Sequence, residues 1–117
     1  MNKLVFIFLS LFLFSIINSQ AALYKGQRVF MKVCTKCHKD GEAFVSAKKK
    51  SVWKKYMKKK GSKLAQVHLK SEKFQKTRKA KKYTKYFKSK KYKKGTRHLK
   101  QFLIEYAKDS GNVPACN

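Results

Sequence analysis

Apolar side chains along the chain recur at intervals of three and four residues, which predicts helices. Between residues 23 and 39, Gly26, Phe30 and Cys34 are spaced by four and therefore share one helix face. A second apolar stripe, near the C-terminus, comprises His98, Leu99, Phe102, Leu103, Tyr106 and Ala107. No segment of useful length alternates apolar and polar residues as a half-buried strand would. The sequence therefore predicts an all-α fold.

Two shorter helices are predicted in the middle of the chain. Ser51 is a suitable N-cap for a helix that carries Trp53 and Met57 until Gly61 breaks it. A further helix, capped by Ser62, has one side formed by Leu64, Val67 and His68.

The segments beside these helices are predicted to be less regular. Residues 42–50 are expected to form a loop. Lys70 to Lys94 has weak periodicity and many lysines, so we expect an exposed helix or an extended basic loop with a few aromatic anchors. The last helix is expected to start after Gly95, with Thr96 as its cap.

The N-terminus has the pattern of a secretory signal. Lys3 precedes an apolar stretch from Leu4 to Ile17, and the small-residue site Ser19-Gln20-Ala21 follows it. Cleavage after Ala21 would leave one small domain, residues 22–117, in the periplasm. An uncleaved anchor is the alternative, but the apolar stretch is shorter than the roughly 20 residues that a membrane span needs.

The net charge of the chain indicates which partners it would attract. Lys and Arg number 31 against five Asp and Glu, a formal net charge of +26, of which the signal contributes only Lys3. Such a surface favours acidic redox partners or an anionic membrane, with binding that weakens as ionic strength rises. Lysines also interleave with aromatic residues, as on a single-strand nucleic-acid surface, at Tyr83, Tyr86, Phe87 and Tyr92. Export argues against nucleic acid as the target.

The most specific chemical signal is the run Cys34-Thr35-Lys36-Cys37-His38. Two cysteines at this spacing can add to the two vinyl groups along one edge of a haem, and the adjacent imidazole can bind the iron as its proximal ligand. A Cys-x-x-Cys pair alone would be weaker, because redox dithiols and zinc sites share it. The motif therefore predicts one covalent haem c held by Cys34 and Cys37, with His38 on the iron. Cys116 then has no partner within the chain, and we expect a free thiol or a pair between chains.

Together these residues resemble the class I, mono-haem c-type cytochromes. That family opens with a helix bearing a Gly, an aromatic residue and the first haem Cys at four-residue spacing, which Gly26, Phe30 and Cys34 match. It closes with a helix of the type Leu-Ile-x-Tyr, which Leu103-Ile104-Glu105-Tyr106 matches. The resemblance implies a small cytochrome c-like fold in which the N- and C-terminal helices cross at the Gly, with haem at the core. It covers both ends of the domain and leaves Lys70 to Lys94 unmatched.

The second axial ligand departs from that pattern. The family takes it from a Met before the last helix, and no Met lies between Lys58 and Asn117. His68 is the preferred candidate, because it lies 30 residues beyond His38 and the break at Gly61 could turn the chain over to the far haem face. Met57, His98, a lysine and an open position are the alternatives.

The leading functional hypothesis is an exported one-electron carrier that docks to acidic redox proteins or membrane-bound oxidoreductases through its lysines. The alternative is haem-based ligand binding, sensing or weak peroxidase activity at an open sixth position. A third hypothesis is a cationic module without haem, in which Cys34 and Cys37 form a redox dithiol. The five carboxylates are scattered and no catalytic constellation can be assembled, so we do not expect an enzyme.

Overall fold

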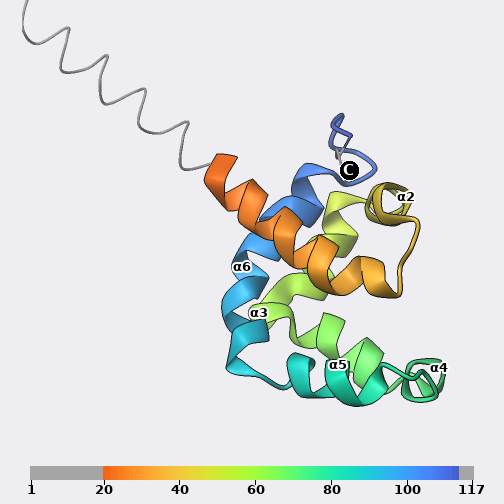
Figure 1. Cartoon of the computed structure of the whole chain (residues 1–117). Coiled ribbons are helices and arrows are strands. Elements are labelled where there is room, and N and C mark those ends of the chain that lie inside the picture. The colour runs from red at the N-terminus through yellow and green to blue at the C-terminus, as the bar shows by residue number, and fades with distance from the viewer. Residues whose placement is uncertain (1–19, 114–117) are drawn as a thin grey trace, which may run out of the picture.

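The computed structural model describes residues 20–113, and helices make up most of this part of the chain (Figure 1). The described part of the first helix covers 20–33 and leads into a 3-10 turn, η1 (Cys34–Lys36). The remaining helices are α2 (Gly41–Ser46), α3 (Lys50–Leu69), α4 (Glu72–Gln75), α5 (Ala80–Phe87) and α6 (Lys90–Glu105). Between residues 20 and 113 there is no strand, which confirms the all-α prediction. Most of the expected signal, residues 1–19, and Cys116 lie outside the described residues.

The first helix packs against α6 at Gly26. A Cβ placed on Gly26 would meet the carbonyl oxygen of His98 and would lie 2.7 Å from the Cβ of Phe102. One turn further along the first helix, the ring of Phe30 lies 5.3 Å from that of Phe102. Only a residue without a side chain allows the two backbones to approach this closely.

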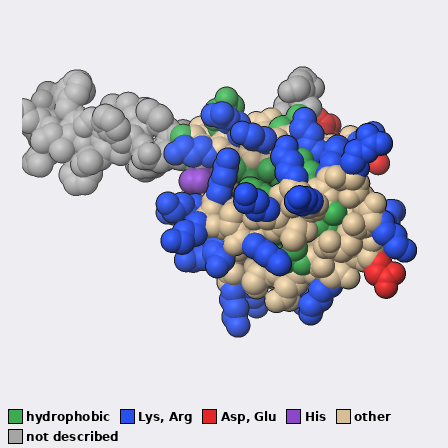
Figure 2. Space-filling view, turned by 60° about the horizontal axis from the view of Figure 1, so that its bottom comes forward, with side chains coloured by type: hydrophobic (Ala, Val, Ile, Leu, Met, Phe, Trp, Pro, Cys, Tyr) green, Lys and Arg blue, Asp and Glu red, His purple; other side chains and the backbone are tan. Residues whose placement is uncertain are grey.

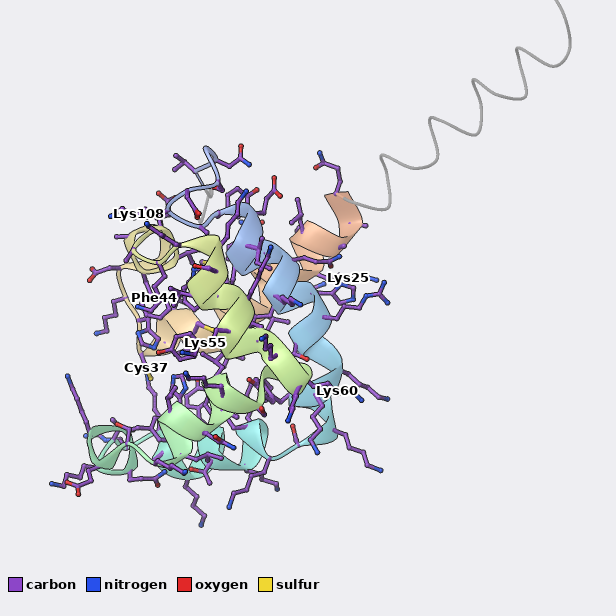
Figure 3. The ribbon with its side chains drawn as sticks, turned by 180° about the vertical axis from the view of Figure 1, so that it is seen from behind. Lys25, Cys37, Phe44, Lys55, Lys60 and Lys108 are labelled. Atoms are coloured by element: carbon purple, nitrogen blue, oxygen red, sulfur yellow. The ribbon has the colours of Figure 1, made fainter. Side chains whose placement is uncertain are left out.

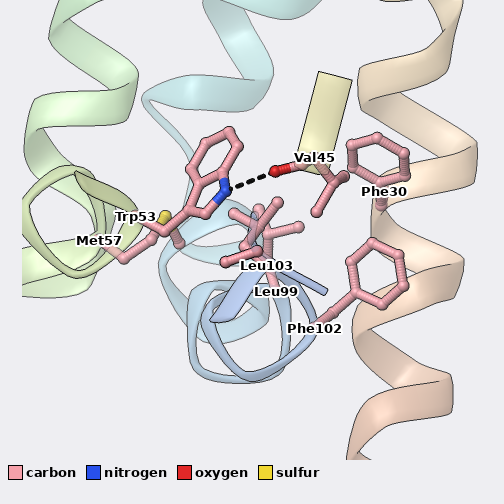
Figure 4. Close-up of a cluster of buried hydrophobic side chains, with 8 residues drawn as sticks. Phe30, Val45, Trp53, Met57, Leu99, Phe102 and Leu103 are labelled. Carbon is pink, nitrogen blue, oxygen red and sulfur yellow. Dashed lines mark hydrogen bonds between the residues drawn. The ribbon is translucent and has the colours of Figure 1, made fainter. Parts of the chain in front are cut away.

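The main core lies between the first helix, α2, the first half of α3 and α6 (Figure 4). Its buried members are Phe30, Val45, Trp53, Met57, Leu99, Phe102, Leu103 and Ala107. The indole Nε1–H of Trp53 donates a buried hydrogen bond of 2.9 Å to the carbonyl of Val45, so this polar group is satisfied inside the core. The expected loop over 42–50 is therefore wrong in its first part, because the short helix α2 carries Val45 inward.

A kink divides α3 into two helical segments, as the sequence predicted at Gly61. Lys58 has an extended backbone, and Lys59, Lys60 and Gly61 have φ values of +49°, +54° and +68°. The hydroxyl of Tyr92 donates a buried hydrogen bond of 2.7 Å to the carbonyl of Gly61 and so ties the kink to α6. The second segment of α3 then runs toward α4 and α5, which lie together at the lower end of the molecule in Figure 1.

Two predicted helix starts are wrong. The helix α6 begins at Lys90, not after Gly95, and the Ser89 hydroxyl accepts the N–H of Tyr92 as its cap. Thr96 is buried inside this helix, where its hydroxyl donates to the Lys93 carbonyl. Helix α3 begins at Lys50, one residue before Ser51.

The cap of α3 comes from the far end of the chain. The Asp109 carboxylate accepts the backbone N–H of Lys50 at 2.7 Å. The backbone N–H of Lys108 also donates to the carbonyl of Lys48 at 2.9 Å. The segment after α6 is therefore fastened to the start of α3.

The surface carries the charge that the composition requires. Figure 2 shows Lys and Arg side chains spread over the whole visible face, with apolar side chains exposed between them. Across residues 20–113, we find no helix with the length and hydrophobicity needed to traverse a bilayer.

Candidate haem site

The Cys–Cys–His motif occupies the tight turn that ends the first helix. The backbone N–H groups of Cys37 and His38 both donate to the carbonyl of Cys34, at 3.2 and 2.8 Å. The Thr35 hydroxyl donates to the Met31 carbonyl at 2.7 Å and closes the last turn of the helix. Because of this local winding, Cys34, Cys37 and His38 all border one cavity.

The two motif thiols have different environments. Cys34 is partly covered and Cys37 is exposed, and both are free thiols. Burial, reinforced by the neighbouring Cys37, raises the pKa of Cys34 to about 12. Cys34 is therefore a neutral thiol in the folded chain at physiological pH, whereas redox-active Cys-x-x-Cys pairs depend on a lowered thiol pKa.

His38 and His68 both line this cavity. Their ring centroids are 6.0 Å apart and their planes are inclined by 85°. His38 comes from the motif turn and stacks on Phe44, with centroids 4.0 Å apart. His68 comes from the second segment of α3 and stacks on Phe87, with centroids 4.7 Å apart. Two elements that are distant in sequence thus bring two imidazoles together, and each imidazole stacks on an aromatic ring.

The electrostatic surroundings favour a neutral His38. Burial lowers its pKa, and the nearby His68 and Lys48 lower it further. Because a metal ion binds the neutral form of imidazole, this shift makes His38 a ready ligand at physiological pH.

The cavity between the walls is apolar. Its own volume is only about 60 Å³, and the roughly 300–1,000 Å³ common for cofactor sites is reached only in the wider hollow that continues from it, which holds about 620 Å³. Besides the motif residues and His68, its lining consists of Val29, Phe30, Val33, Phe44, Trp53, Leu64, Phe74, Tyr83, Tyr86, Phe87, Tyr92, Leu99 and Leu103. Figure 3 shows Cys37 and Phe44 close together on one side of the molecule, above the α4–α5 region.

A wider hollow continues from this cavity to the surface. It shares Cys37, His38, Phe44 and His68 with the cavity. Its outer lining includes the cations Lys36, Lys39, Lys48, Lys73, Arg78 and Lys79, which we call the basic rim. The amine of Lys79 donates to the carbonyl of Lys36 at 2.9 Å and so bridges the hollow between the motif turn and the segment before α5.

These residues fit a haem. The two motif thiols and the His38 imidazole line the cavity, a second imidazole lies 6.0 Å from that of His38, and the remaining lining is almost wholly aromatic and aliphatic. Across 20–113, no three His, Cys, Asp or Glu side chains form a group that could hold a metal ion by themselves. A macrocycle supplies four ligands of its own, so one or two imidazoles are all that the protein must add.

The other two candidates for the second axial ligand do not border the cavity. Met57 is buried in the main core beside Trp53. His98 lies on α6, where its carbonyl faces Gly26. The Nδ1 atom of His98 is buried and has no hydrogen-bond partner among the described residues.

The sequence predicted a few aromatic anchors between Lys70 and Lys94, but not that α4, α5 and the start of α6 would place them together as one wall of the cavity. Its members are Phe74, Tyr83, Tyr86, Phe87 and Tyr92. The signal was present at Ala80, Tyr83 and Phe87, whose spacing of i, i+3 and i+7 marks one face of a helix, but the surrounding lysines obscured it.

Comparisons with protein-family models, with curated proteins and with solved structures found no significant match to this chain.

Proposed function

We propose that this protein is an exported mono-haem c-type cytochrome that carries single electrons. The observation that carries the proposal is the motif turn, which presents Cys34, Cys37 and His38 to an apolar cavity. Cys34 and Cys37 would hold the haem through two thioethers, and His38 would bind its iron. The iron supplies a reversible one-electron couple, whose potential the protein sets through its ligands, burial and nearby charge.

The chain's own residues position the group and exclude water from it. The stack between Phe44 and His38 fixes the orientation of the proximal ring. The close contact at Gly26 and the packing of Phe30 on Phe102 support the proposed cytochrome c-like arrangement of the terminal helices. With apolar rings on most sides, the cavity has a low dielectric constant, so charge near its mouth acts strongly on the group inside.

The basic rim supports docking to an acidic redox protein or to a membrane-bound oxidoreductase. Its cations surround the hollow that leads to Cys37 and His38, the point at which an electron would enter or leave. Complementary charge accelerates encounter and orients the partner, and it depends on ionic strength. The same surface would attract an anionic membrane.

The environment of Cys34 favours the haem hypothesis over a redox dithiol. A dithiol that exchanges disulfides needs an accessible thiolate. Burial raises the pKa of Cys34, so the exposed Cys37 is the only motif thiol that is open to that chemistry.

Mass spectrometry of the exported protein tests the proposal. Co-expressed with a cytochrome c maturation system, the protein is expected to remain red after acid-acetone extraction and to have the mass of residues 22–117 plus one haem. Cys34→Ala and Cys37→Ala should each lose one thioether, while Thr35→Ala, inside the same turn, should keep both. Extraction of all colour into the solvent, or an apoprotein mass in every preparation, would overturn it.

A further inference from the structure

The separation of His38 and His68 is that of two ligands on opposite sides of one metal ion. A bond of about 2 Å on each side, with about 1 Å more from each nitrogen to its ring centre, gives roughly 6 Å between such rings. The observed centroid separation is 6.0 Å. The two side chains are 30 positions apart in sequence, so this spacing is a product of the fold.

The orientation of His68 is fixed by its neighbours. Its Nδ1 atom lies 2.7 Å from the carbonyl of Leu64, one turn earlier on the same helix, and can only donate to that oxygen. The proton therefore stays on Nδ1, and Nε2 keeps the lone pair that binds a metal. Phe87 stacks on the ring and Phe74 meets it edge-on, with centroids 4.7 and 5.7 Å away.

The competing ligands are less well placed. Met57 and His98 do not line the cavity, and the lysines nearest to it belong to the basic rim outside. Among the described histidines, His68 alone joins His38 at the cavity wall.

We propose that Nε2 of His68 binds the haem iron on the face opposite His38, with the Leu64 carbonyl and Phe87 acting to position the ring. This inference rests on the proposed covalent haem and replaces the Met that the family resemblance implies. Ligation by two imidazoles lowers the reduction potential relative to a His/Met pair. The proposal also closes the sixth position to small external ligands.

Spectroscopy of the haem-loaded protein tests the inference. The wild-type protein is expected to be low-spin and to lack the weak far-red band of Met ligation. His68→Ala should become high-spin, and added imidazole should restore the low-spin state. His98→Ala and Met57→Leu are matched controls, because they remove the two other candidates, and both should keep the wild-type spectrum.

Affinity for an external ligand gives a quantitative readout. If His68 occupies the sixth position about 99% of the time, imidazole will bind the wild-type protein about 100-fold more weakly than it binds His68→Ala. Equal affinities, or an unchanged low-spin spectrum in His68→Ala, would overturn the assignment. A spin change in His98→Ala or Met57→Leu instead would assign the ligand to that residue.

If His68→Ala does not acquire covalent haem, the wild-type protein can still be used to test the inference. Pulsed electron paramagnetic resonance of wild-type protein grown with nitrogen-15 histidine should detect two imidazoles coupled to the iron, and one imidazole would refute the inference. If extraction has already removed the haem, the proposed function has failed. If the haem is covalent but only one imidazole is bound, the proposed function stands and the assignment of His68 fails.

Discussion

Replacing Gly26 by Ala tests the close contact between the first helix and α6. In an isolated helix this change stabilises by about 1 kcal/mol, because Gly is a poor helix former. Here the added Cβ would clash with the backbone carbonyl oxygen of His98 and would lie 2.7 Å from the Cβ of Phe102. Overpacking a core costs about 1–3 kcal/mol, and a backbone obstacle cannot rotate away as a side chain can. We therefore expect a net destabilisation of about 2 kcal/mol, or roughly 10 °C in the melting temperature.

Gly95→Ala is the matched control for this variant. Gly95 also lies inside a helix, but a Cβ there would meet only the Cγ2 of Val29, at an ordinary contact distance of 3.7 Å. The helix-propensity gain should therefore survive, and we expect a stabilisation of about 0.5–1 kcal/mol. Urea unfolding followed by circular dichroism, on both variants and the wild type in the same haem state, measures the difference. If Gly26→Ala were as stable as Gly95→Ala, the proposed contact between the helices would be wrong.

Three further outcomes are expected. Gly61→Ala should lower the free energy of unfolding in urea by about 2 kcal/mol, because Ala resists a φ of +68° and its Cβ would displace the Tyr92 hydroxyl. A Gly61→Ala variant with wild-type stability would contradict this. The hydrogen bond from Lys50 N–H lowers the pKa of Asp109, so its contribution to stability is present above the unfolded pKa and is lost as the pH falls below about 4. The wild type should therefore exceed Asp109→Asn in unfolding midpoint at pH 7 and approach it in acid; a gap that does not narrow would rule out the carboxylate as the cap. Finally, stopped-flow electron transfer to an acidic redox protein should slow markedly as salt is added, and a salt-independent rate would leave the lysines without a docking role.

The parts of the fold that the sequence predicted well depend on local pattern. The break at Gly61 and the stripe on the last helix follow from residue types within a few positions of one another. The start of α6 was misjudged because Gly95 resembles a boundary, whereas Ser89 supplies the cap and Gly95 is held inside the helix against Val29. The cap of α3 could not be read locally, because Asp109 lies 59 residues from Lys50.

The predictions for the candidate site also depend on whether the residues are close in sequence. Cys34, Cys37 and His38 lie within five residues of one another, so the motif can be recognised from their spacing alone. His68 was a candidate by its position on an apolar helix face, but its distance from His38 and its stacking on Phe87 depend on how α3 bends and packs. A single sequence contains no signal for that tertiary arrangement.

The arrangement of α5 and α6 also bears on the choice of partner. In the sequence, lysines alternate with aromatic rings as they would on a surface that stacks nucleic-acid bases. In the fold, Tyr83 and Tyr92 are buried, and Tyr86 and Phe87 are partly covered and turn toward the cavity. Burial raises the pKa of Tyr86 to about 12, which agrees with its position in the apolar wall. Rings that line the cavity are less available for stacking on nucleic-acid bases, which favours the proposed acidic protein partner over nucleic acid. The positive charge of this region matches the acidic redox partner proposed above, because it would guide the encounter and the cavity would hold the proposed haem.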